Sequence, residues 1–360
     1  MCADSSVLPI VSSLPHAYAV ILAGGRGERF WPLSTYHRPK QFISLFGGTS
    51  LLSQAVARLD GLVAPDCIFV ITSNDLIDAT RRTVPQLSPD QIIGEPMSKN
   101  TAAAVALACG LVRTRDKEGI VAILTADQLM TDVPQFKAVL ADSYLVASRE
   151  KAIITIGIAP TYPATGFGYI ECADPLEIAE ATPFHRVARF VEKPDAITAK
   201  AYLELGTFVW NAGMFIGRVN VFENAYKAHA PQYVPLILFP ERKDEFYPTL
   251  PTLSIDYALM EKCSNLLVAR GDFGWDDVGS LTALGTHFPA DAQHNVFLSP
   301  TTAIQTENCV VASEGVNRPT ALLGVSDLLV IHTDKATLIC NKKHAQEIKK
   351  LIPLLPEELR

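Results

Sequence analysis

The chain has 360 residues, of which 48% are hydrophobic and 19% are charged, and its formal net charge at pH 7 is −7. This composition is ordinary for a globular protein with a large apolar core. The negative charge and the absence of a run of Lys or Arg argue against a surface that binds nucleic acid.

Residues 1–16 are predicted to form a loose N-terminal extension. They contain no Lys or Arg and are interrupted by Pro9 and Pro15, so they lack the charged start of a secretory signal. Seven cysteines are scattered along the chain without a Cys-x-x-Cys pair, which favours reduced thiols. No apolar stretch approaches the length of a membrane span. We therefore expect a cytoplasmic protein without a membrane partner.

Apolar runs alternate with helical patterns over the first two-thirds of the chain. Strands are predicted at 18–23, 67–72, 120–125 and 153–158. Helices are predicted between them at 50–62, 100–114 and 134–148, with a cap at Asn100 or Thr101. This alternation predicts an α/β fold with a mixed, mostly parallel sheet, and ligands at the carboxyl ends of its strands.

The pattern changes twice in the rest of the chain. From about 166 to 269 it loosens into short strands and loops, before a helix that ends near His287. Residues 295–340 show short β-like runs without helices between them, and a terminal helix follows at about 343–352. We therefore predict one large α/β domain over 17–290 and a small β-rich domain over 295–360 that ends in a helix.

A glycine-rich segment follows the first predicted strand directly. Its residues are Ala23, Gly24, Gly25 and Gly27. Glycines in this position let the backbone approach a ligand closely, with N–H groups aimed at phosphate oxygens. Arg29 and Lys40 add two cations, enough to hold a polyphosphate. The segment therefore predicts a nucleotide site, against the alternative of an irregular turn with solvated cations.

Neither of two familiar phosphate loops fits this segment. The chain has no Gly-Lys pair, which a P-loop requires, and Phe30 stands where the dinucleotide fingerprint needs its third glycine. The segment does fit Gly-Gly-x-Gly-x-Arg followed by Pro-Lys, and so resembles the sugar-1-phosphate nucleotidyltransferases. The variant with Phe30-Trp31-Pro32 and Arg38-Pro39-Lys40-Gln41-Phe42 resembles the bacterial mannose-1-phosphate guanylyltransferases in particular.

The resemblance extends over roughly 17–290 and more loosely over 295–355. It implies a Rossmann-like nucleotidyltransferase domain that transfers GMP from GTP to mannose 1-phosphate, giving GDP-mannose and pyrophosphate with Mg²⁺ as cofactor. Arg29, Lys40 and Lys193 are then the catalytic cations, and the glycine-rich segment binds the nucleotide. Relatives also suggest a homodimer through the C-terminal domain.

Two aspartates are candidate metal ligands. Asp127 directly follows the strand at 120–125, and Asp277 lies in Trp275-Asp276-Asp277-Val278-Gly279-Ser280. Mg²⁺ prefers few carboxylates plus phosphate oxygens, and the resemblance matches both positions to the family's metal-binding aspartates. Asp276 departs from the family pattern, and strand alternation turns it away from Asp277, the residue that the motif favours. The alternative is that a strand-end aspartate caps a turn.

Other motifs point to the sugar phosphate. By resemblance, Lys193 in Phe190-Val191-Glu192-Lys193-Pro194 contacts the sugar's phosphate, and Glu192 its hydroxyls. The alternative is a surface ion pair worth little. Gly166 and Asn211 resemble residues of the family's sugar-contacting loops, although each could be plain turn chemistry. Asp256 matches a family motif and could equally cap a helix.

The segment from Glu95 to Thr101 resembles the family's base-recognition segment. The Glu95 carboxylate could accept both donors of guanine, N1–H and the N2 amine. The alternative is that Glu95 is exposed and the backbone around Asn100 and Thr101 reads the base.

Three rival functions remain at this stage. One is a nucleotidyltransferase for another hexose or heptose 1-phosphate, or for another nucleotide. The second is a non-catalytic paralogue that binds GDP-mannose and regulates a partner; retention of both metal carboxylates argues against it. The third is a two-function chain that carries an isomerase domain beside the transferase. It is disfavoured because only about 65 residues follow the transferase and they lack a His/Glu metal pattern.

Overall fold

The computed structural model describes residues 14–360, so most of the predicted extension, 1–16, lies outside the described residues. Contacts group the chain into two compact units. Of the described residues, the larger unit comprises those up to Leu22, Ala55–Thr125 and Met130–Trp275, and the smaller unit comprises Ala23–Gln54, Ala126–Leu129 and Asp276–Arg360. This grouping follows contacts in space. The predicted domains 17–290 and 295–360 are continuous stretches of sequence and stay a prediction.

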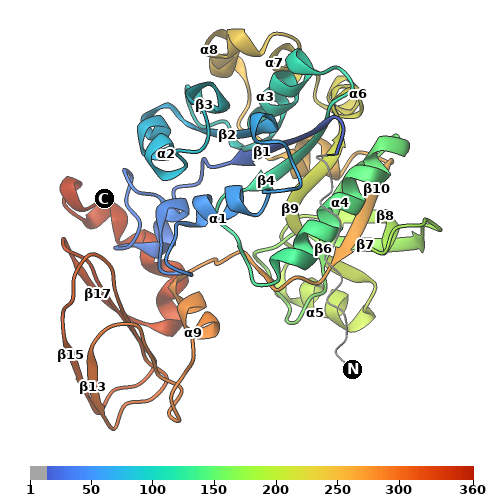
Figure 1. The fold of residues 1–360 in the computed structure, drawn as a ribbon. Coiled ribbons are helices and arrows are strands. Elements are labelled where there is room, and N and C mark those ends of the chain that lie inside the picture. The colour runs from blue at the N-terminus through green and yellow to red at the C-terminus, as the bar shows by residue number, and fades with distance from the viewer. Residues whose placement is uncertain (1–13) are drawn as a thin grey trace, which may run out of the picture. The chain divides into compact units, whose positions relative to one another are not determined.

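A nine-stranded sheet forms the centre of the larger unit, in the order β3-β2-β1-β4-β9-β6-β10-β8-β7 (Figure 1). Its strands are β1 (Ala17–Leu22), β2 (Ile68–Ser73), β3 (Ile92–Glu95), β4 (Ile120–Thr125), β6 (Ile153–Ile158), β7 (Tyr169–Pro175), β8 (Phe184–Val191), β9 (Phe208–Arg218) and β10 (Leu266–Gly271). The four strands predicted in the first half of the chain are confirmed as β1, β2, β4 and β6.

The sheet is mixed, as predicted, but "mostly parallel" overstates its parallel share. Strands β3, β2, β1 and β4 pair in parallel, as do β6 and β10. The pairs β4–β9, β9–β6, β10–β8 and β8–β7 are antiparallel. The antiparallel pairs involve β9 and β8, and β9, which pairs with both β4 and β6, lies in a stretch predicted as short strands and loops. Its Asn and Gly residues gave that stretch the composition of a turn.

Helices cover the sheet of the larger unit. They are α2 (Ile77–Thr83), α3 (Asn100–Arg115), α4 (Val133–Arg149), α5 (Ala196–Leu205), α6 (Val219–His229), α7 (Val234–Leu238) and α8 (Lys243–Phe246). The predicted helices at 100–114 and 134–148 are confirmed as α3 and α4, whereas the one predicted at 50–62 ends earlier, as α1 (Leu51–Ala57). Helices α3, α6 and α7 pack against one another, and α4 packs against β4, β6, β9 and β10 (Figure 1).

Helix α3 lies in the apolar core of this unit, with Ala102 to Gly110 buried. A Cβ added at Gly110 would come within 2.4 Å of the carbonyl oxygen of Leu236 in α7. The small side chains of α3 therefore allow close helix packing. Neither Asn100 nor Thr101 caps α3 as predicted, because the cap position is Lys99 and no side chain closes it there.

Short strands without intervening helices occupy residues 296–341 of the smaller unit, close to the predicted range of 295–340. They are β12 (Val296–Phe297), β13 (Thr301–Ile304), β14 (Val310–Ser313), β15 (Thr320–Leu323), β16 (Leu328–His332) and β17 (Thr337–Asn341). Strands β12, β14 and β16 pair in parallel, β17 joins β16 antiparallel, and β13 pairs with β15 in parallel. Parallel pairing of successive short strands indicates a coiled, β-helix-like arrangement. The two-residue strands β5 (Leu129–Met130) and β11 (Trp275–Asp276) pair with each other.

Short helices before and after the β-rich segment contribute to the apolar core of the smaller unit. The helix predicted near His287 is a short 3₁₀ turn, Leu281–Ala283, followed by α9 (Leu284–His287). The predicted terminal helix is a 3₁₀ helix, η11 (Lys342–Lys350), with a further turn at Ile352–Leu354. One apolar cluster joins Phe30 and Trp31 to residues of the β-rich segment and of η11. Within 14–360, no helix has the length and apolarity needed to cross a bilayer.

Candidate active site

Within the smaller unit, a pocket of about 570 Å³ gathers the charged residues predicted for the phosphates and the metal. Its lining includes Arg26, Arg29, Lys40, Asp127, Asp277 and Lys349. Four of these are predicted site residues from three distant stretches of the chain. The structure therefore places two predicted cations and both predicted metal carboxylates in one pocket.

Lys40 is the central residue of this pocket. It begins a short 3₁₀ helix, η2 (Lys40–Phe42), and is only 6% exposed. Its ammonium group donates to Oδ2 of Asp127 at 3.1 Å and to the backbone oxygen of Asp277. A buried lysine needs such partners, because burial disfavours its charge. Lys40 therefore ties the two aspartate segments together.

The glycine-rich segment explains how the backbone reaches Lys40. Gly27 has φ +62°, and a Cβ added there would come within 2.3 Å of the Lys40 Cβ and 2.9 Å of its backbone N. Only glycine fits this conformation and this approach. By contrast, a Cβ at Gly25 would meet no atom within 4 Å, which leaves space for a ligand. Before these glycines, the backbone oxygen of Ala23 accepts a 2.8 Å hydrogen bond from Gln41, and Gly24 is exposed.

Asp276 and Asp277 have different surroundings, in line with the predicted alternation. Asp276 accepts from the backbone N–H of Val278 at 2.6 Å and lies 2.8 Å from Nε2 of His287. Burial raises the Asp276 pKa, but these bonds outweigh burial and lower it overall. The carboxyl group of Asp277 lines the pocket, where burial, opposed by Lys40, raises its pKa to about 6. Val278 has φ +49°, a strained value for a β-branched residue and one often found at functional sites.

The carboxylates of Asp127 and Asp277 fit a divalent metal ion. Burial makes the charge of Asp277 costly, and Asp127 raises its pKa further, so a cation there would stabilise both groups. No cluster of three or more His, Cys, Asp or Glu that could hold a metal exists among residues 14–360. An ion bound here would therefore take further ligands from substrate phosphates, which is the coordination that Mg²⁺ favours.

A second group of predicted residues meets in the larger unit. Lys193 lies 2.6 Å from Oε1 of Glu192 and has φ +47°. Burial lowers the Lys193 pKa, but the hydrogen bond and charge of Glu192 outweigh burial and raise it overall. Asn211 donates to Oδ1 of Asp256 at 3.2 Å. Burial, followed by the charge of Glu192, raises the Asp256 pKa to about 6. These groups form a polar cluster able to bind a phosphorylated sugar.

The Asn211 side chain is held rigidly in that cluster. Its Oδ1 accepts from the hydroxyl of Thr155 and from the backbone N–H of Gly213, each at 3.0 Å. The glycine that adjoins the cluster is Gly168, where an added Cβ would come within 2.6 Å of Oε2 of Glu192. Predicted Gly166 has no atom within 4 Å of such a Cβ. The tight approach therefore occurs two residues after the predicted one.

The predicted base-recognition residues also lie in the larger unit. Glu95 ends β3, is 9% exposed, and accepts a 2.9 Å hydrogen bond from the hydroxyl of Tyr247. Burial, opposed by this bond, raises its pKa to about 7. Asn100 has φ +63°, and its side-chain oxygen accepts from the N–H of Thr101 at 2.7 Å. The Thr101 hydroxyl accepts from the N–H of Ile255 at 2.9 Å. Glu95 is therefore buried, not exposed as its alternative supposed, and whether its carboxyl group or the backbone around Asn100 and Thr101 reads the base stays a prediction.

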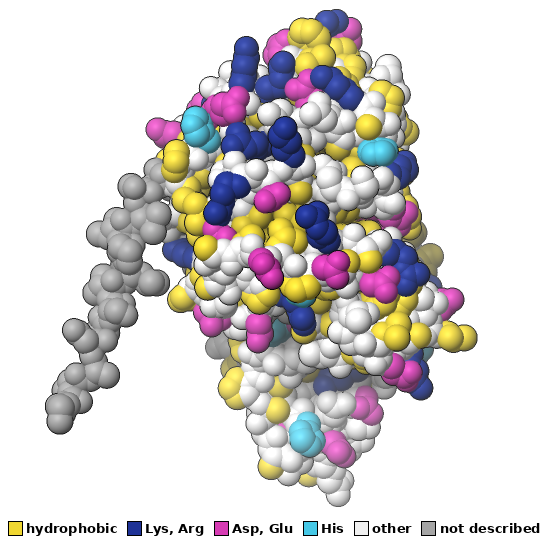
Figure 2. Space-filling view, turned by 90° about the vertical axis from the view of Figure 1, so that its right-hand side faces the viewer, with side chains coloured by type: hydrophobic (Ala, Val, Ile, Leu, Met, Phe, Trp, Pro, Cys, Tyr) yellow, Lys and Arg dark blue, Asp and Glu magenta, His cyan; other side chains and the backbone are white. Residues whose placement is uncertain are grey.

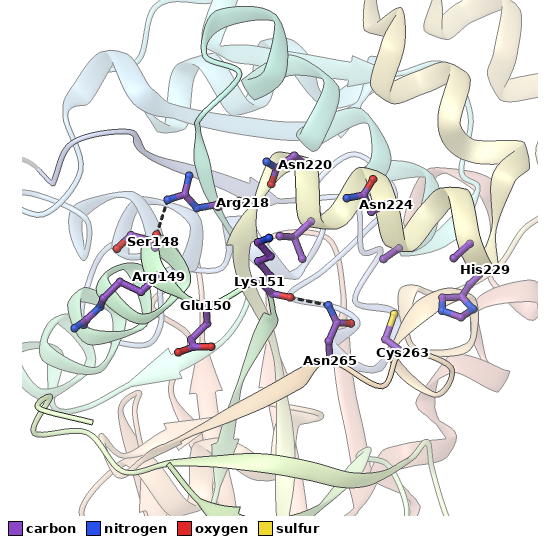
Figure 3. Close-up of a pocket in the computed structure, with 13 residues that line it drawn as sticks. Ser148, Arg149, Glu150, Lys151, Arg218, Asn220, Asn224, His229, Cys263 and Asn265 are labelled. Carbon is purple, nitrogen blue, oxygen red and sulfur yellow. Dashed lines mark hydrogen bonds between the residues drawn. The ribbon is translucent and has the colours of Figure 1, made fainter. Parts of the chain in front are cut away.

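Another pocket, of about 540 Å³, lies in the larger unit between the end of α4 and helix α6 (Figure 3). Its lining contains none of the predicted site residues. Its arginines have partners, since Arg149 pairs with Glu180 and Arg218 pairs with Glu118 at 3.0 Å. On the face drawn in Figure 2, Lys and Arg side chains are interspersed with Asp and Glu.

Comparison with known proteins decides the family. The family model described as nucleotidyl transferase matches residues 18–294. The chain belongs to this family. A second model, described as a MannoseP isomerase/GMP-like beta-helix domain, matches residues 301–355 of this nucleotidyl transferase.

Several curated relatives are similar over most of the chain. The mannose-1-phosphate guanylyltransferase of Klebsiella pneumoniae is 34% identical over 95% of this chain and 74% of the relative. The enzyme of the same name from Salmonella montevideo is 36% identical over the same shares. These identities support the reading of the chain as a nucleotidyltransferase enzyme.

Solved structures agree on the fold of this nucleotidyl transferase. A crystal structure described as mannose-1-phosphate geranyltransferase from Thermus thermophilus has a TM-score of 0.85 and 33% identity, over 94% of this chain and 99% of that chain. A mannose-6-phosphate isomerase structure from Helicobacter pylori has a TM-score of 0.59 and 23% identity, over 72% of this chain and 99% of that chain. The second likeness shows a shared fold alone.

Sequence reasoning missed three residues that lie beside the predicted site residues, namely Gly168, Tyr247 and Lys349. Gly168 lies in the same motif as Gly166, and only the position of Glu192 distinguishes the two glycines. Tyr247 and Lys349 lie in no motif, and each meets its partners through the fold alone. The one available signal was that a buried Glu95 would need a hydrogen-bond donor, and this need does not identify Tyr247 as the residue that supplies the donor.

Proposed function

We propose that this nucleotidyl transferase transfers GMP from GTP to mannose 1-phosphate, releasing GDP-mannose and pyrophosphate, with Mg²⁺ as the metal. The observation that carries the proposal is the position of Lys40, which joins Asp127 and the backbone of Asp277 in a pocket lined by further cations. This arrangement suits a metal-bound triphosphate. It also gives a reason for both aspartates, which a non-catalytic binding protein would not need.

The reaction requires no nucleophile from the protein. A phosphate oxygen of mannose 1-phosphate forms a bond to the α-phosphorus of GTP, and the bond from that phosphorus to the oxygen bridging it to the β-phosphate breaks. The electron pair leaves with pyrophosphate. The protein's task is to hold two anions in line and to neutralise the charge of the leaving group.

Each charged residue of the pocket has a part in this task. Arg29 and Lys40 face the leaving pyrophosphate and stabilise its growing charge. Asp127 and Asp277 would hold Mg²⁺, which neutralises phosphate charge when it is bound. The open space beside Gly25 lets the backbone N–H groups approach a phosphate oxygen.

The polar cluster of the larger unit suits the sugar phosphate. The ammonium group of Lys193 provides a cation for the phosphate, and its bond to Glu192 keeps it charged. Glu192 and Asp256 provide acceptors for sugar hydroxyls. Mannose and guanine are chosen over other sugars and bases because of the relatives' names and the match of Glu95 to the base-recognition segment.

The direct test is pyrophosphate release from the purified chain. GTP, ATP, CTP and UTP would each be combined with mannose 1-phosphate, glucose 1-phosphate and a heptose 1-phosphate, with and without Mg²⁺. We expect pyrophosphate release only when GTP, mannose 1-phosphate and Mg²⁺ are all present. Faster turnover of another pair would identify that pair as the substrates in place of GTP and mannose 1-phosphate. No release with any pair, together with tight binding of GDP-mannose, would favour the regulatory paralogue.

We further propose a homodimer through the C-terminal domain. Ile304 in β13 and Leu323 in β15 are register partners, and they are 61% and 70% exposed. Two large apolar side chains side by side on an exposed sheet face suit a contact with a second copy. Ile304→Lys should shift the chain to a monomer in sedimentation equilibrium; a wild-type monomer would contradict the dimer.

A further inference from the structure

The 3₁₀ helix η11 carries a lysine to the phosphate pocket. Lys349 lines the same pocket as Arg29, Lys40 and Asp127, all within the smaller unit. We propose that Lys349 binds the terminal phosphates of the nucleotide and the pyrophosphate formed from them. The inference rests on the proposed function and adds a residue for which the motifs gave no role.

Packing fixes the position of Lys349. In η11, Ala345 and Ile348 are 2% and 1% exposed and belong to the same apolar cluster as Phe30. Phe30 ends the short helix η1 (Glu28–Phe30), which packs against η11 and carries Arg29. The apolar contact between the two helices therefore places the backbone of both Arg29 and Lys349 at the edge of one pocket. The exposed side chain of Lys349 stays free to follow a ligand.

The charges of the pocket leave a role for this cation. Lys40 is already bonded to Asp127 and to the backbone of Asp277. The guanidinium group of Arg26 lies 5.0 Å from the ring centre of Tyr36. Lys349 forms no ion pair within residues 14–360, and its ammonium is a compact charge on a flexible stem. Such a group can hold a phosphate that later departs.

The adjacent residue offers a matched control. Lys350 has the same charge, lies on the same helix, and pairs with Glu347 at 2.8 Å. It is absent from the residues that line the pocket. Comparing Lys349→Gln with Lys350→Gln therefore separates a contact with phosphate from the loss of one positive charge near the C-terminus.

The experiment measures binding of inorganic pyrophosphate by calorimetry in Mg²⁺, for the wild type and for Lys349→Gln, Lys349→Arg and Lys350→Gln. We expect Lys349→Gln to weaken binding about tenfold, since a charge-assisted contact is lost. Lys349→Arg should restore most of the affinity, and Lys350→Gln should stay within about twofold of wild type. All variants should melt at the wild-type temperature, because both side chains are exposed.

Steady-state kinetics supply the second measurement. Lys349→Gln should raise the KM for GTP or lower kcat and leave the KM for mannose 1-phosphate unchanged. Equal pyrophosphate binding by Lys349→Gln and wild type, or equal weakening by Lys350→Gln, would overturn the assignment. Wild type that binds pyrophosphate through Lys349 but makes no GDP-mannose would support this inference while refuting the proposed substrates.

Discussion

The hydroxyl of Tyr247 donates a 2.9 Å hydrogen bond to Oε1 of Glu95, across 152 positions of sequence. Both side chains are buried. The bond holds the carboxyl group at the end of β3 in one orientation, and burial makes its ionisation costly. A carboxylate held in this way would discriminate strongly between bases, because a base without matching donors would leave it unpaired.

The first prediction concerns the base. Glu95→Gln should narrow the preference for GTP over ITP, since inosine lacks only the N2 amine that the carboxylate is proposed to accept. The measurement compares kcat/KM for GTP, ITP and ATP in wild type and mutant. Tyr247→Phe is the control, because it removes the orienting bond and keeps the carboxylate. If the ratio of kcat/KM for GTP to kcat/KM for ITP were the same in the mutant as in wild type, the assignment of Glu95 to base recognition would be wrong.

The second prediction follows from the pKa of Glu95, raised to about 7 by burial. The unfolded chain has an ordinary glutamate pKa near 4.3. Between these values the folded state binds more protons, so stability should fall as pH rises through this window, by at most roughly 4 kcal/mol. Glu95→Gln should remove this loss. Melting temperatures of wild type and mutant at pH 5 and pH 8 test this prediction. A mutant whose melting temperature at pH 8 does not rise relative to that of wild type would contradict it.

A third prediction separates the aspartates. Asp127→Asn and Asp277→Asn should each lower turnover at least about 10²-fold, because a metal ion that loses a charged ligand no longer holds the phosphates in line. Asp276→Asn should do much less, since its carboxylate bonds Val278 and His287. The measurement is kcat at saturating Mg²⁺. If Asp276→Asn proved the most damaging, Asp277 would be the wrong member of the pair.

The fourth prediction uses two glycines of the same segment. Gly27→Ala should destabilise the fold and reduce activity, since its Cβ would displace Lys40. Gly25→Ala should melt like wild type, because its Cβ meets nothing within 4 Å. It should still lower activity if a phosphate approaches that backbone. Thermal melting and turnover of the two variants test this, and full activity of Gly25→Ala would place the nucleotide elsewhere.

The fifth prediction divides the substrates between cations. Lys193→Ala should raise the KM for mannose 1-phosphate far more than that for GTP, because its charge serves one partner only. Arg29→Ala should instead impair use of the triphosphate and lower kcat. Lys40→Ala should also lower kcat, through loss of the bond to Asp127. Equal effects of all three on both KM values would contradict the division.

Local pattern was sufficient to predict most of the first half of the fold. Strands β1, β2, β4 and β6 are continuous apolar runs, and a buried strand needs no other signal. Strand β9 was not predicted as one long strand, because Asn211 and Gly213 give it the composition of a turn. The strand nevertheless pairs with both β4 and β6. Antiparallel pairing at the sheet's centre depends on that strand and was therefore missed.

The charged residues of the site could be predicted where motifs carry them, as for Lys40 and Asp127. Their mutual contact could not, because the hydrogen bond between them depends on how segments 87 positions apart fold together. Tyr247 and Lys349 lie outside every motif. Their contribution depends on tertiary packing, and a single sequence holds no record of which distant residue fills a buried partner's need.

The apolar cluster around Phe30 and Trp31 has a consequence for the order in which the molecule matures during its synthesis. The indole of Trp31 donates a 2.8 Å hydrogen bond to the carbonyl oxygen of Leu359, and η11 covers the same cluster. A ribosome releases residues 23–54 long before 342–360. The nascent chain therefore carries an uncovered aromatic surface, and an unfinished phosphate pocket, until η11 emerges.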